Sequence, residues 1–524
     1  MTIHGAAPPL DPRLWKAAAL DHSISTTALG SLFDPWGNHP VGKVHEKIAD
    51  IYGVAKSLIS TNGTTALNKL ALFALLQPGD VVLVERDCHV SVVQALNEIG
   101  ATPVWLLPPF DKELGINLAS TPEAIAAELD RHHDVRAVVL TSPKYFGVVG
   151  DIAACVKTCH DHGAMVLVDE AHGACLRFHP DLPVSATAVG ADVVTQSTHK
   201  VTEAWSQGSL MLINNADLCP RLLHALHGTA ALSTSFHFGI LASVEVAVTN
   251  LERSGRVRLD AALRLAHVLR EGVRRIDGLA AWGPEQAGKP GFRQLDSLRV
   301  TVGVTKLGIP GLEVDALLQA KDQEHAIIAE LGTLRHVLFI LTYGHQMADV
   351  TRLLDRLRAI AASAPRSRRT LAPVNIPSAL PEQALSPRTA FWEIARGAVQ
   401  RVPVNESIGR VSAECIAVYP PGNAMIVHGE RITEEVVAYL EQAAGAGAFL
   451  KGATDPEFAT VGILPDDQRV RRLLSEAAGP RGAWRNHGLK ASLRGCPVTV
   501  DFGRRRSGSG NACEDGQRAS SRRG

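Results

Sequence analysis

The stretch from about residue 44 to residue 215 alternates short apolar runs with segments of helical periodicity. The apolar runs, rich in β-branched residues, are 81–85, 102–107, 136–142, 165–170 and 191–197. Runs that are apolar throughout and are joined by helices are typical of a parallel sheet covered on both faces. The pattern therefore predicts an α/β fold class with a mainly parallel sheet. In such sheets ligands bind beyond the carboxyl ends of the strands, so we expect functional residues directly after these runs.

The rest of the chain divides into smaller pieces. A long helical stretch from about 237 to 275 leads out of the predicted sheet. We expect an N-terminal segment (1–43), a large domain (44–275) and a small α/β domain (276–363). These are followed by a linker rich in Pro, Ser and Arg (364–387), a C-terminal domain (388–465) and a low-complexity, disordered tail (466–524).

Charge and cysteine content exclude several classes of protein. Lys plus Arg and Asp plus Glu both number 53, so the balanced charge gives no reason to expect nucleic acid or a membrane surface as a partner. The first residues lack the features of a secretory signal, and no run approaches the roughly 20 apolar residues of a membrane span. Cys155 and Cys159 lie four residues apart, but no second pair of Cys or His follows at a spacing typical of zinc sites. We therefore expect buried or inert thiols and no metal site. Eight cysteines without a framework favour the cytoplasm.

A Thr-Asn-Gly turn precedes a predicted helix that begins near Thr64 and Thr65. The amino end of a helix offers free backbone N–H groups and the positive end of its dipole, and two hydroxyls add donors there. This arrangement suits a phosphate group. The alternative is a simple N-cap by threonine, which explains these residues equally well on their own.

Polar side chains follow four of the predicted strands. His89 comes after the run 81–85, a Thr-Ser-Pro turn ends the run 136–142, Asp169 ends the next, and 191–197 leads into Lys200. Each has an ordinary alternative, since a histidine or aspartate at a strand end is often a cap. A lysine at the end of a buried strand is costly unless it is paired or covalently used. Together, a phosphate site near Thr64, an imidazole, an acid and a lysine are the groups that an enzyme uses to bind pyridoxal phosphate.

Several motifs carry a resemblance to a known family. They are "NGTTALN", "RDCHVSV", "TSPKYFGVVGDI", "DEAHGA", "STHK" with "SQGSLM", "STSFHFGILASVEVA", "GIPGLEVDALL", "SPRTAF", "ESIGRVSAECIAVYPPG" and "GERITEEVVAYL". In this order, from about residue 20 to 465, the chain resembles the bacterial ornithine/lysine/arginine decarboxylases. The resemblance implies the aspartate-aminotransferase fold, fold type I of pyridoxal phosphate enzymes, with a seven-stranded type of sheet. It also implies active sites formed between two subunits.

The resemblance assigns roles to individual residues. Lys200 would bind the cofactor as a Schiff base, Asp169 would pair with the pyridine nitrogen, and His89 would stack on the ring. The loss of CO2 would form a quinonoid intermediate, and His199 or Lys200 would then return a proton to its Cα. Further residues expected at the cofactor are Thr64, Thr65, Ala171, His172, Ser197, Ser233, Thr234 and Ser235, the last three from across a dimer interface.

Two departures leave the substrate open. The family usually opens with a Pro-Gly-His-Lys segment that this chain lacks, and its paired His-Lys and its Ser-Pro read His89-Val90 and Ser235-Phe236 here. We also expect the N-terminal receiver-like wing of the large inducible enzymes to be absent. The first hypothesis is decarboxylation of arginine, lysine or ornithine, as in polyamine biosynthesis. The alternative is oxidative deamination, or other Cα chemistry on an unusual amino acid. Glu330 is the acid that the resemblance offers for a cationic side chain, and a solvated acid at a strand end is its alternative. A homodimer or higher homo-oligomer is expected.

Overall fold

The computed structural model describes residues 34–229, 236–320, 326–364, 377, 379–419, 423–466 and 468–477. The predicted cofactor residues Ser233, Thr234 and Ser235 lie outside the described residues, as does most of the expected N-terminal segment. In the part of the chain that the structure describes, no helix is long and apolar enough to cross a membrane.

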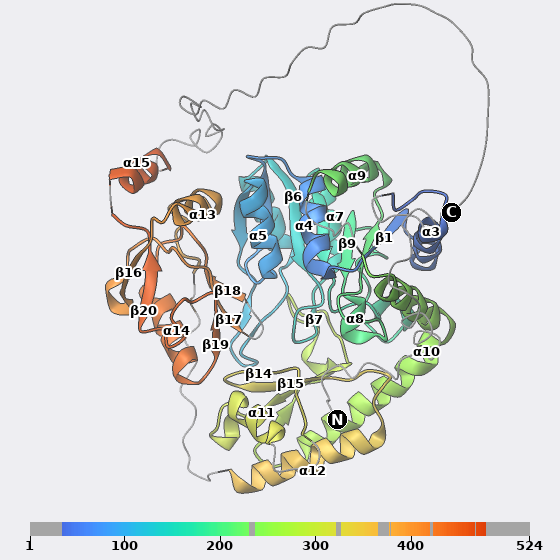
Figure 1. The fold of residues 1–524 in the computed structure, drawn as a ribbon. Helices are drawn as coiled ribbons and strands as arrows, with labels where there is room; N and C mark the ends of the chain where they lie inside the picture. Colours follow the sequence, from blue (N-terminus) through green and yellow to red (C-terminus); the bar gives the residue numbers. More distant parts are fainter. Residues whose placement is uncertain are drawn as a thin grey trace, which may run out of the picture. The chain divides into compact units, whose positions relative to one another are not determined.

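A seven-stranded sheet forms the centre of the large domain (Figure 1). In spatial order its strands are β1 (Lys56–Ser60), β10 (Ser209–Ile213), β9 (Val193–Gln196), β8 (Met165–Asp169), β6 (Val135–Thr141), β2 (Val81–Glu85) and β3 (Thr102–Leu106). β10 pairs antiparallel with both β1 and β9, while β9, β8, β6, β2 and β3 pair in parallel. The predicted α/β fold with a mainly parallel sheet is thus confirmed.

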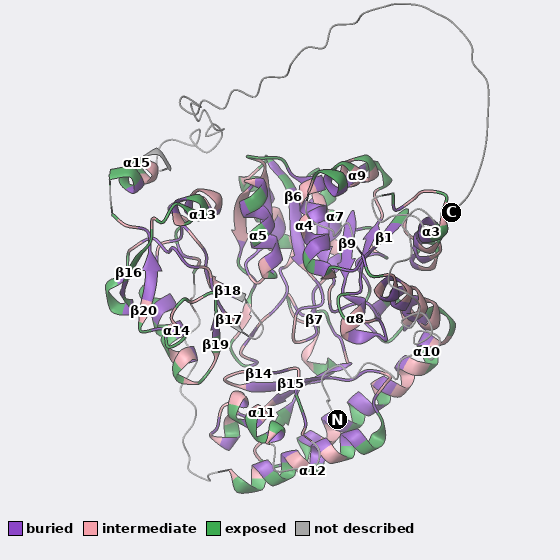
Figure 2. Ribbon diagram, viewed as in Figure 1, coloured by how far each residue is buried: buried purple, intermediate pink, exposed green. Residues whose placement is uncertain are grey.

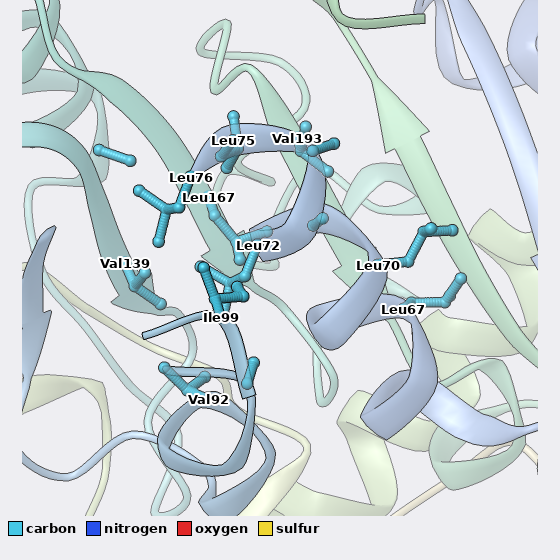
Figure 3. Packing of buried hydrophobic residues seen from close by; sticks show 14 of the residues in the cluster. Leu67, Leu70, Leu72, Leu75, Leu76, Val92, Ile99, Val139, Leu167 and Val193 are labelled. Carbon is cyan, nitrogen blue, oxygen red and sulfur yellow. The ribbon is translucent and has the colours of Figure 1, made fainter. Parts of the chain in front are cut away.

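Successive residues of each strand pack on opposite faces of the sheet, because strand side chains alternate with a period of two. The strands of this sheet are mostly coloured as buried in Figure 2. On one face Val82, Val139 and Leu167 contact a first group of helices, and Figure 3 shows Val139 and Leu167 with Leu72 and Ile99 from two of these helices. On the other face Leu83, Val138 and Val168 contact a second group. The first group is α4 (Gly63–Leu75), α5 (Val90–Ile99) and α9 (Cys219–Gly228). The second group is α3 (Pro40–Tyr52), α6 (Pro122–Arg131) and α7 (Ile152–Asp161).

The 37-residue helix α10 (Phe238–Arg274) joins the large domain to a second core. Its first half packs with the sheet of the large domain, and its second half contributes Leu269 and Val273 to the smaller core. The sheet of that core has the order β11 (Ala280–Ala281), β13 (Arg299–Gly303), β15 (His336–Ile340) and β14 (Leu331–Gly332). The helices α11 (Gly311–Gln319) and α12 (Met347–Ser363) complete it.

The C-terminal piece has a core of its own around Ile416, Leu440 and Ile463. Its elements are α13 (Pro387–Ala395), β16 (Gln400–Pro403), β17 (Ile416–Tyr419), β18 (Asn423–Ile426), α14 (Glu434–Gly445), β19 (Phe449–Lys451), β20 (Thr460–Ile463) and α15 (Gln468–Ala477). Helix α15 falls inside the predicted tail 466–524, and its Val470 is buried. The described C-terminal piece therefore extends past the predicted end at residue 465. Residues 478–524 lie outside the described residues.

A buried ion pair ties the C-terminal piece to the end of β2. The guanidinium of Arg86 donates from Nη1 and Nη2 to the two carboxylate oxygens of Glu430, over 2.6 and 2.7 Å. Its Nε donates to the carbonyl of Ala424, and its guanidinium lies over the ring of Trp105. Glu430 is fully buried, so the loss of its partner would leave a carboxylate without its counter-charge.

We predict that Arg86→Ala lowers the free energy of unfolding by about 3–5 kcal/mol, because it leaves the buried Glu430 uncompensated. Denaturation in urea, followed by tryptophan fluorescence, measures the change. Arg358→Ala is the matched control, since Arg358 and Asp355 form an exposed pair whose loss costs about 1 kcal/mol or less. Equal losses in the two variants would contradict a stabilising role for the buried pair.

Candidate active site

A cavity of about 340 Å³ opens at the carboxyl edge of the central sheet. Every predicted cofactor or catalytic residue that the structure describes lines it: Thr64, Thr65, His89, Asp169, Ala171, His172, Ser197, His199 and Lys200. The segments between them provide the rest of the wall, including Pro143 of the predicted Thr-Ser-Pro turn. The parallel strands explain the convergence, because their carboxyl ends meet at one edge.

Asp169 is the last residue of β8, and only 4% of its surface is exposed. Its Oδ2 accepts a hydrogen bond from Nδ2 of Asn68 over 2.8 Å, and its Oδ1 accepts one from the backbone N–H of Ala171 over 3.0 Å. Each oxygen thus accepts one hydrogen bond from a neutral N–H. The two bonds also fix the plane of the carboxylate at the cavity wall.

Lys200 lies on the short helix α8 (Thr198–Val201), which starts directly after β9. Its Nζ lies 3.1 Å from Nε2 of His172. Burial lowers the pKa of Lys200, and the carboxylates of Asp169 and Glu330 oppose that shift. Burial also holds the pKa of His172 well below its usual range, so the imidazole is neutral and can accept a hydrogen bond from the amine.

The start of α4 and the residue that follows β9 bring hydroxyl groups to the cavity wall. Thr64, in the first turn of α4, has its Oγ1 2.6 Å from Oγ of Ser197, and both side chains are buried. The N–H of Gly63 donates to the carbonyl of Gln207, a residue with a φ of +72°. Non-glycine residues seldom adopt this conformation, so the surrounding contacts must hold the 207 turn against the start of α4. This part of the cavity wall suits an anion.

The two other predicted histidines have fixed tautomers. Nδ1 of His89 accepts from the backbone N–H of Ser91, so its ring hydrogen lies on Nε2. Nδ1 of His199 lies 2.9 Å from the carbonyl of Gly208 and must donate to it. Burial lowers the pKa of both rings. Both are therefore neutral imidazoles at ordinary pH.

Four residues of the cavity wall were not predicted from the sequence. Asn68 and Gln207 are described above, and Lys144 and Tyr145 follow the Thr-Ser-Pro turn into the cavity wall. The spacing of Asn68 offers a signal, since it lies four residues after Thr64 and therefore on the same helix face. Lys144 and Tyr145 also stand directly after a strand end. The hydroxyl of Tyr145 donates to Glu330 over 2.7 Å, although the two residues are 185 positions apart in the sequence. No local sequence pattern could have predicted this contact.

The donor set of the cavity fits pyridoxal phosphate. Thr64, Thr65 and Ser197 can hold its phosphate, and Asp169 can accept from its pyridine nitrogen. Lys200 supplies a buried amine whose pKa is lowered, as binding to the cofactor aldehyde requires. Among the described residues, no group of three or more His, Cys, Asp or Glu side chains is placed to hold a metal ion.

Comparison with known proteins gives the same cofactor. Family models described as "Orn/Lys/Arg decarboxylase, major domain" and "Orn/Lys/Arg decarboxylase, C-terminal domain" match residues 16–349 and 374–452. An arginine decarboxylase of Halalkalibacterium halodurans is 31% identical over 454 residues, which are 86% of this chain and 90% of that protein. An arginine decarboxylase of Bacillus subtilis is 30% identical over 450 residues, with the same coverage. A lysine decarboxylase of Pseudomonas aeruginosa, LdcA, is 28% identical over 80% of this chain and 69% of its own length.

Solved structures agree on the fold. Lysine decarboxylase A from Pseudomonas aeruginosa matches with a TM-score of 0.71 at 23% identity, over 84% of this chain and 74% of that chain. A serine palmitoyltransferase from Sphingomonas wittichii matches with a TM-score of 0.51 at 18% identity, over 68% of this chain and 85% of that chain. The fold is therefore that of the type I pyridoxal phosphate enzymes. The chain belongs to the Orn/Lys/Arg decarboxylase family, and it is an amino-acid decarboxylase that uses pyridoxal phosphate.

Proposed function

We propose that the enzyme decarboxylates a basic amino acid, with arginine as the first candidate and lysine and ornithine as the others. The observation that supports this proposal is a carboxylate that contacts a residue of the cavity wall and whose charge acts on the amine of Lys200. Glu330 accepts a hydrogen bond from Tyr145, which lines the cavity, and its charge acts on Lys200. A carboxylate at this place would attract the cationic end of a substrate. The arginine decarboxylases that are 30–31% identical over 90% of their length support arginine.

Pyridoxal phosphate, when bound, supplies a sink for the electron pair that remains at Cα when the carboxylate leaves as CO2. Asp169 can hold a proton on the pyridine nitrogen, because both of its oxygens are fixed as acceptors. Neutral His172 accepts a hydrogen bond from Lys200 and holds the amine in the cavity. Thr64 and Ser197 orient the phosphate end.

The proton that replaces CO2 at Cα is assigned to Lys200. Nδ1 of His199 donates its hydrogen to the carbonyl of Gly208, and burial lowers the pKa of the His199 imidazole. Its Nε2 therefore carries no proton at neutral pH and cannot donate one. Lys200, an amine in the cavity wall whose pKa is lowered by burial, is the group that remains to supply this proton.

Incubation with arginine, lysine and ornithine in separate reactions tests the function. We predict CO2 and the corresponding amine in equal amounts, no hydrogen peroxide, and the highest rate with arginine. Lys200→Ala should lower turnover by at least roughly 100-fold, because it removes both the covalent anchor and the proton donor. Peroxide with a carbonyl product would establish oxidative deamination instead. No turnover of arginine, lysine or ornithine would reject a basic amino acid as the substrate. Near-normal turnover by Lys200→Ala would reject Lys200 as the covalent anchor and proton donor.

The role of Glu330 is tested by Glu330→Gln, which keeps its size and removes its charge. We predict that kcat/KM for arginine falls roughly 10- to 100-fold, as expected when a hydrogen bond to a charged group is lost. Glu313→Gln is the matched control, since Glu313 is an exposed acid on α11 of the same small domain. Unchanged rates with arginine, lysine and ornithine would remove Glu330 from substrate recognition.

We also propose that the active enzyme is a homodimer or a higher oligomer. The resemblance to the family supports this, because its sites form between two subunits and residues 233–235 match its cross-subunit segment. Light scattering of the active sample should give at least twice the chain mass of 55.9 kDa. A fully active species with the mass of one chain would contradict the proposal.

A further inference from the structure

Asn68 is a buried polar residue in the cavity wall. It lies in the second turn of α4, only 1% exposed, on a helix whose other inward side chains include Leu67, Ala71 and Leu72. A buried amide is costly unless its oxygen and both hydrogens find partners. The partners of Asn68 therefore indicate what the residue is there to hold.

The side-chain amide of Asn68 has only one orientation that satisfies its surroundings. Nδ2 lies 2.8 Å from Oδ2 of Asp169, and an ionised carboxylate can only accept, so the nitrogen must face it. The second Nδ2 hydrogen is directed to Oγ of Ser91 over 3.2 Å. Thr195 of β9 donates from Oγ1 to Oδ1 over 2.6 Å. All three sites of the amide are thus used, and Thr195 and Ser91 are themselves fully buried.

Ser91 carries the chain of hydrogen bonds on to His89. Its Oγ lies 2.8 Å from Nδ1 of His89, which also accepts from the backbone N–H of Ser91. Because Oγ already accepts from Asn68, its own hydrogen is available to donate to Nδ1. One asparagine is therefore hydrogen-bonded to Asp169 directly and to His89 through a single serine.

We propose that Asn68 is a positioning residue that fixes Asp169 and His89 relative to each other. In the proposed function, on which this inference rests, the acid binds the pyridine nitrogen and the imidazole lies on the ring. The two contacts meet one flat cofactor from different directions, so their mutual geometry decides how the ring is held. Asp169 comes from β8 and His89 from the loop after β2, and β6 separates these strands. Asn68 on α4 bridges that separation.

Asn68→Asp is the decisive variant. It keeps the size of the residue and the acceptor for Thr195, but it removes the N–H bonds to Asp169 and Ser91 and places two carboxylates side by side. One of the two must then bind a proton more readily. We expect a roughly 10- to 100-fold weaker affinity of the apoenzyme for pyridoxal phosphate at neutral pH, with recovery as the pH falls and the new carboxyl group regains a donor hydrogen. Visible circular dichroism of the bound cofactor should change as well.

Three further variants complete the test. Asn68→Ala should weaken cofactor affinity without the recovery at low pH. Ser91→Ala should change the visible circular dichroism with a smaller loss of affinity, because Asp169 keeps its bond to Asn68. Asn97→Ala is the matched control, a buried asparagine on α5 that does not line the cavity, and it should change neither readout.

The proposal is overturned if Asn68→Asp folds, binds pyridoxal phosphate and matches the wild type in affinity, circular dichroism and pH dependence. It is also overturned if Asn97→Ala causes the same changes, or if neither variant of Asn68 folds, since the residue would then serve folding alone. None of these readouts uses an amino-acid substrate. A failure of the proposed substrate class, seen as absent turnover by the wild type, is therefore distinguishable from a failure of the positioning role.

Discussion

The buried contact of Lys144 with two carboxylates fixes the edge of the sheet on which the site is built. Its Nζ lies 2.6 Å from Oδ1 of Asp87 and 2.8 Å from Oε2 of Glu85, and all three side chains are almost wholly buried. Burial lowers the pKa of Lys144, but the two carboxylates outweigh burial and raise it. Glu85 also accepts the backbone N–H groups of Ser120 and Thr141, so it binds the end of β2 to the end of β6. Without the lysine, two buried acids would repel each other at this point.

Glu85, Arg86, Asp87 and His89 are each held by polar contacts. Glu85 and Asp87 bind Lys144, Arg86 binds Glu430 of the C-terminal piece, and His89 caps α5 and contacts Ser91. The loop that brings His89 to the cavity wall is thus fixed by the large domain and the C-terminal piece together. This explains how an imidazole at a loop end can keep a defined orientation.

The sequence predicted those parts of the site whose position follows from local pattern. Asp169, Lys200, Thr64 and His89 stand directly at strand or helix ends, and the parallel sheet brings such ends to one edge. Asn68 was missed because its role depends on a partner 101 residues away, which no local pattern shows. The pairing of Tyr145 with Glu330 was missed for the same reason. Helix α15 was missed because its arginines resemble the low-complexity sequence that follows, while its buried contacts come only from tertiary packing.

The hydrogen bond between Tyr145 and Glu330 joins two parts of the chain that can vary separately. The described residues that line the cavity lie within 62–207 around one sheet, whereas Glu330 precedes β14 in another sheet with its own core. Mutations in the small core can therefore shift the acid without disturbing Lys200 or Asp169. Under the role proposed for Glu330, substitutions in the small core can change which amino acid is accepted while the residues that line the cavity at the large sheet stay unchanged. Such a division of labour offers a physical route by which relatives with one cofactor site diverge toward different amino acids.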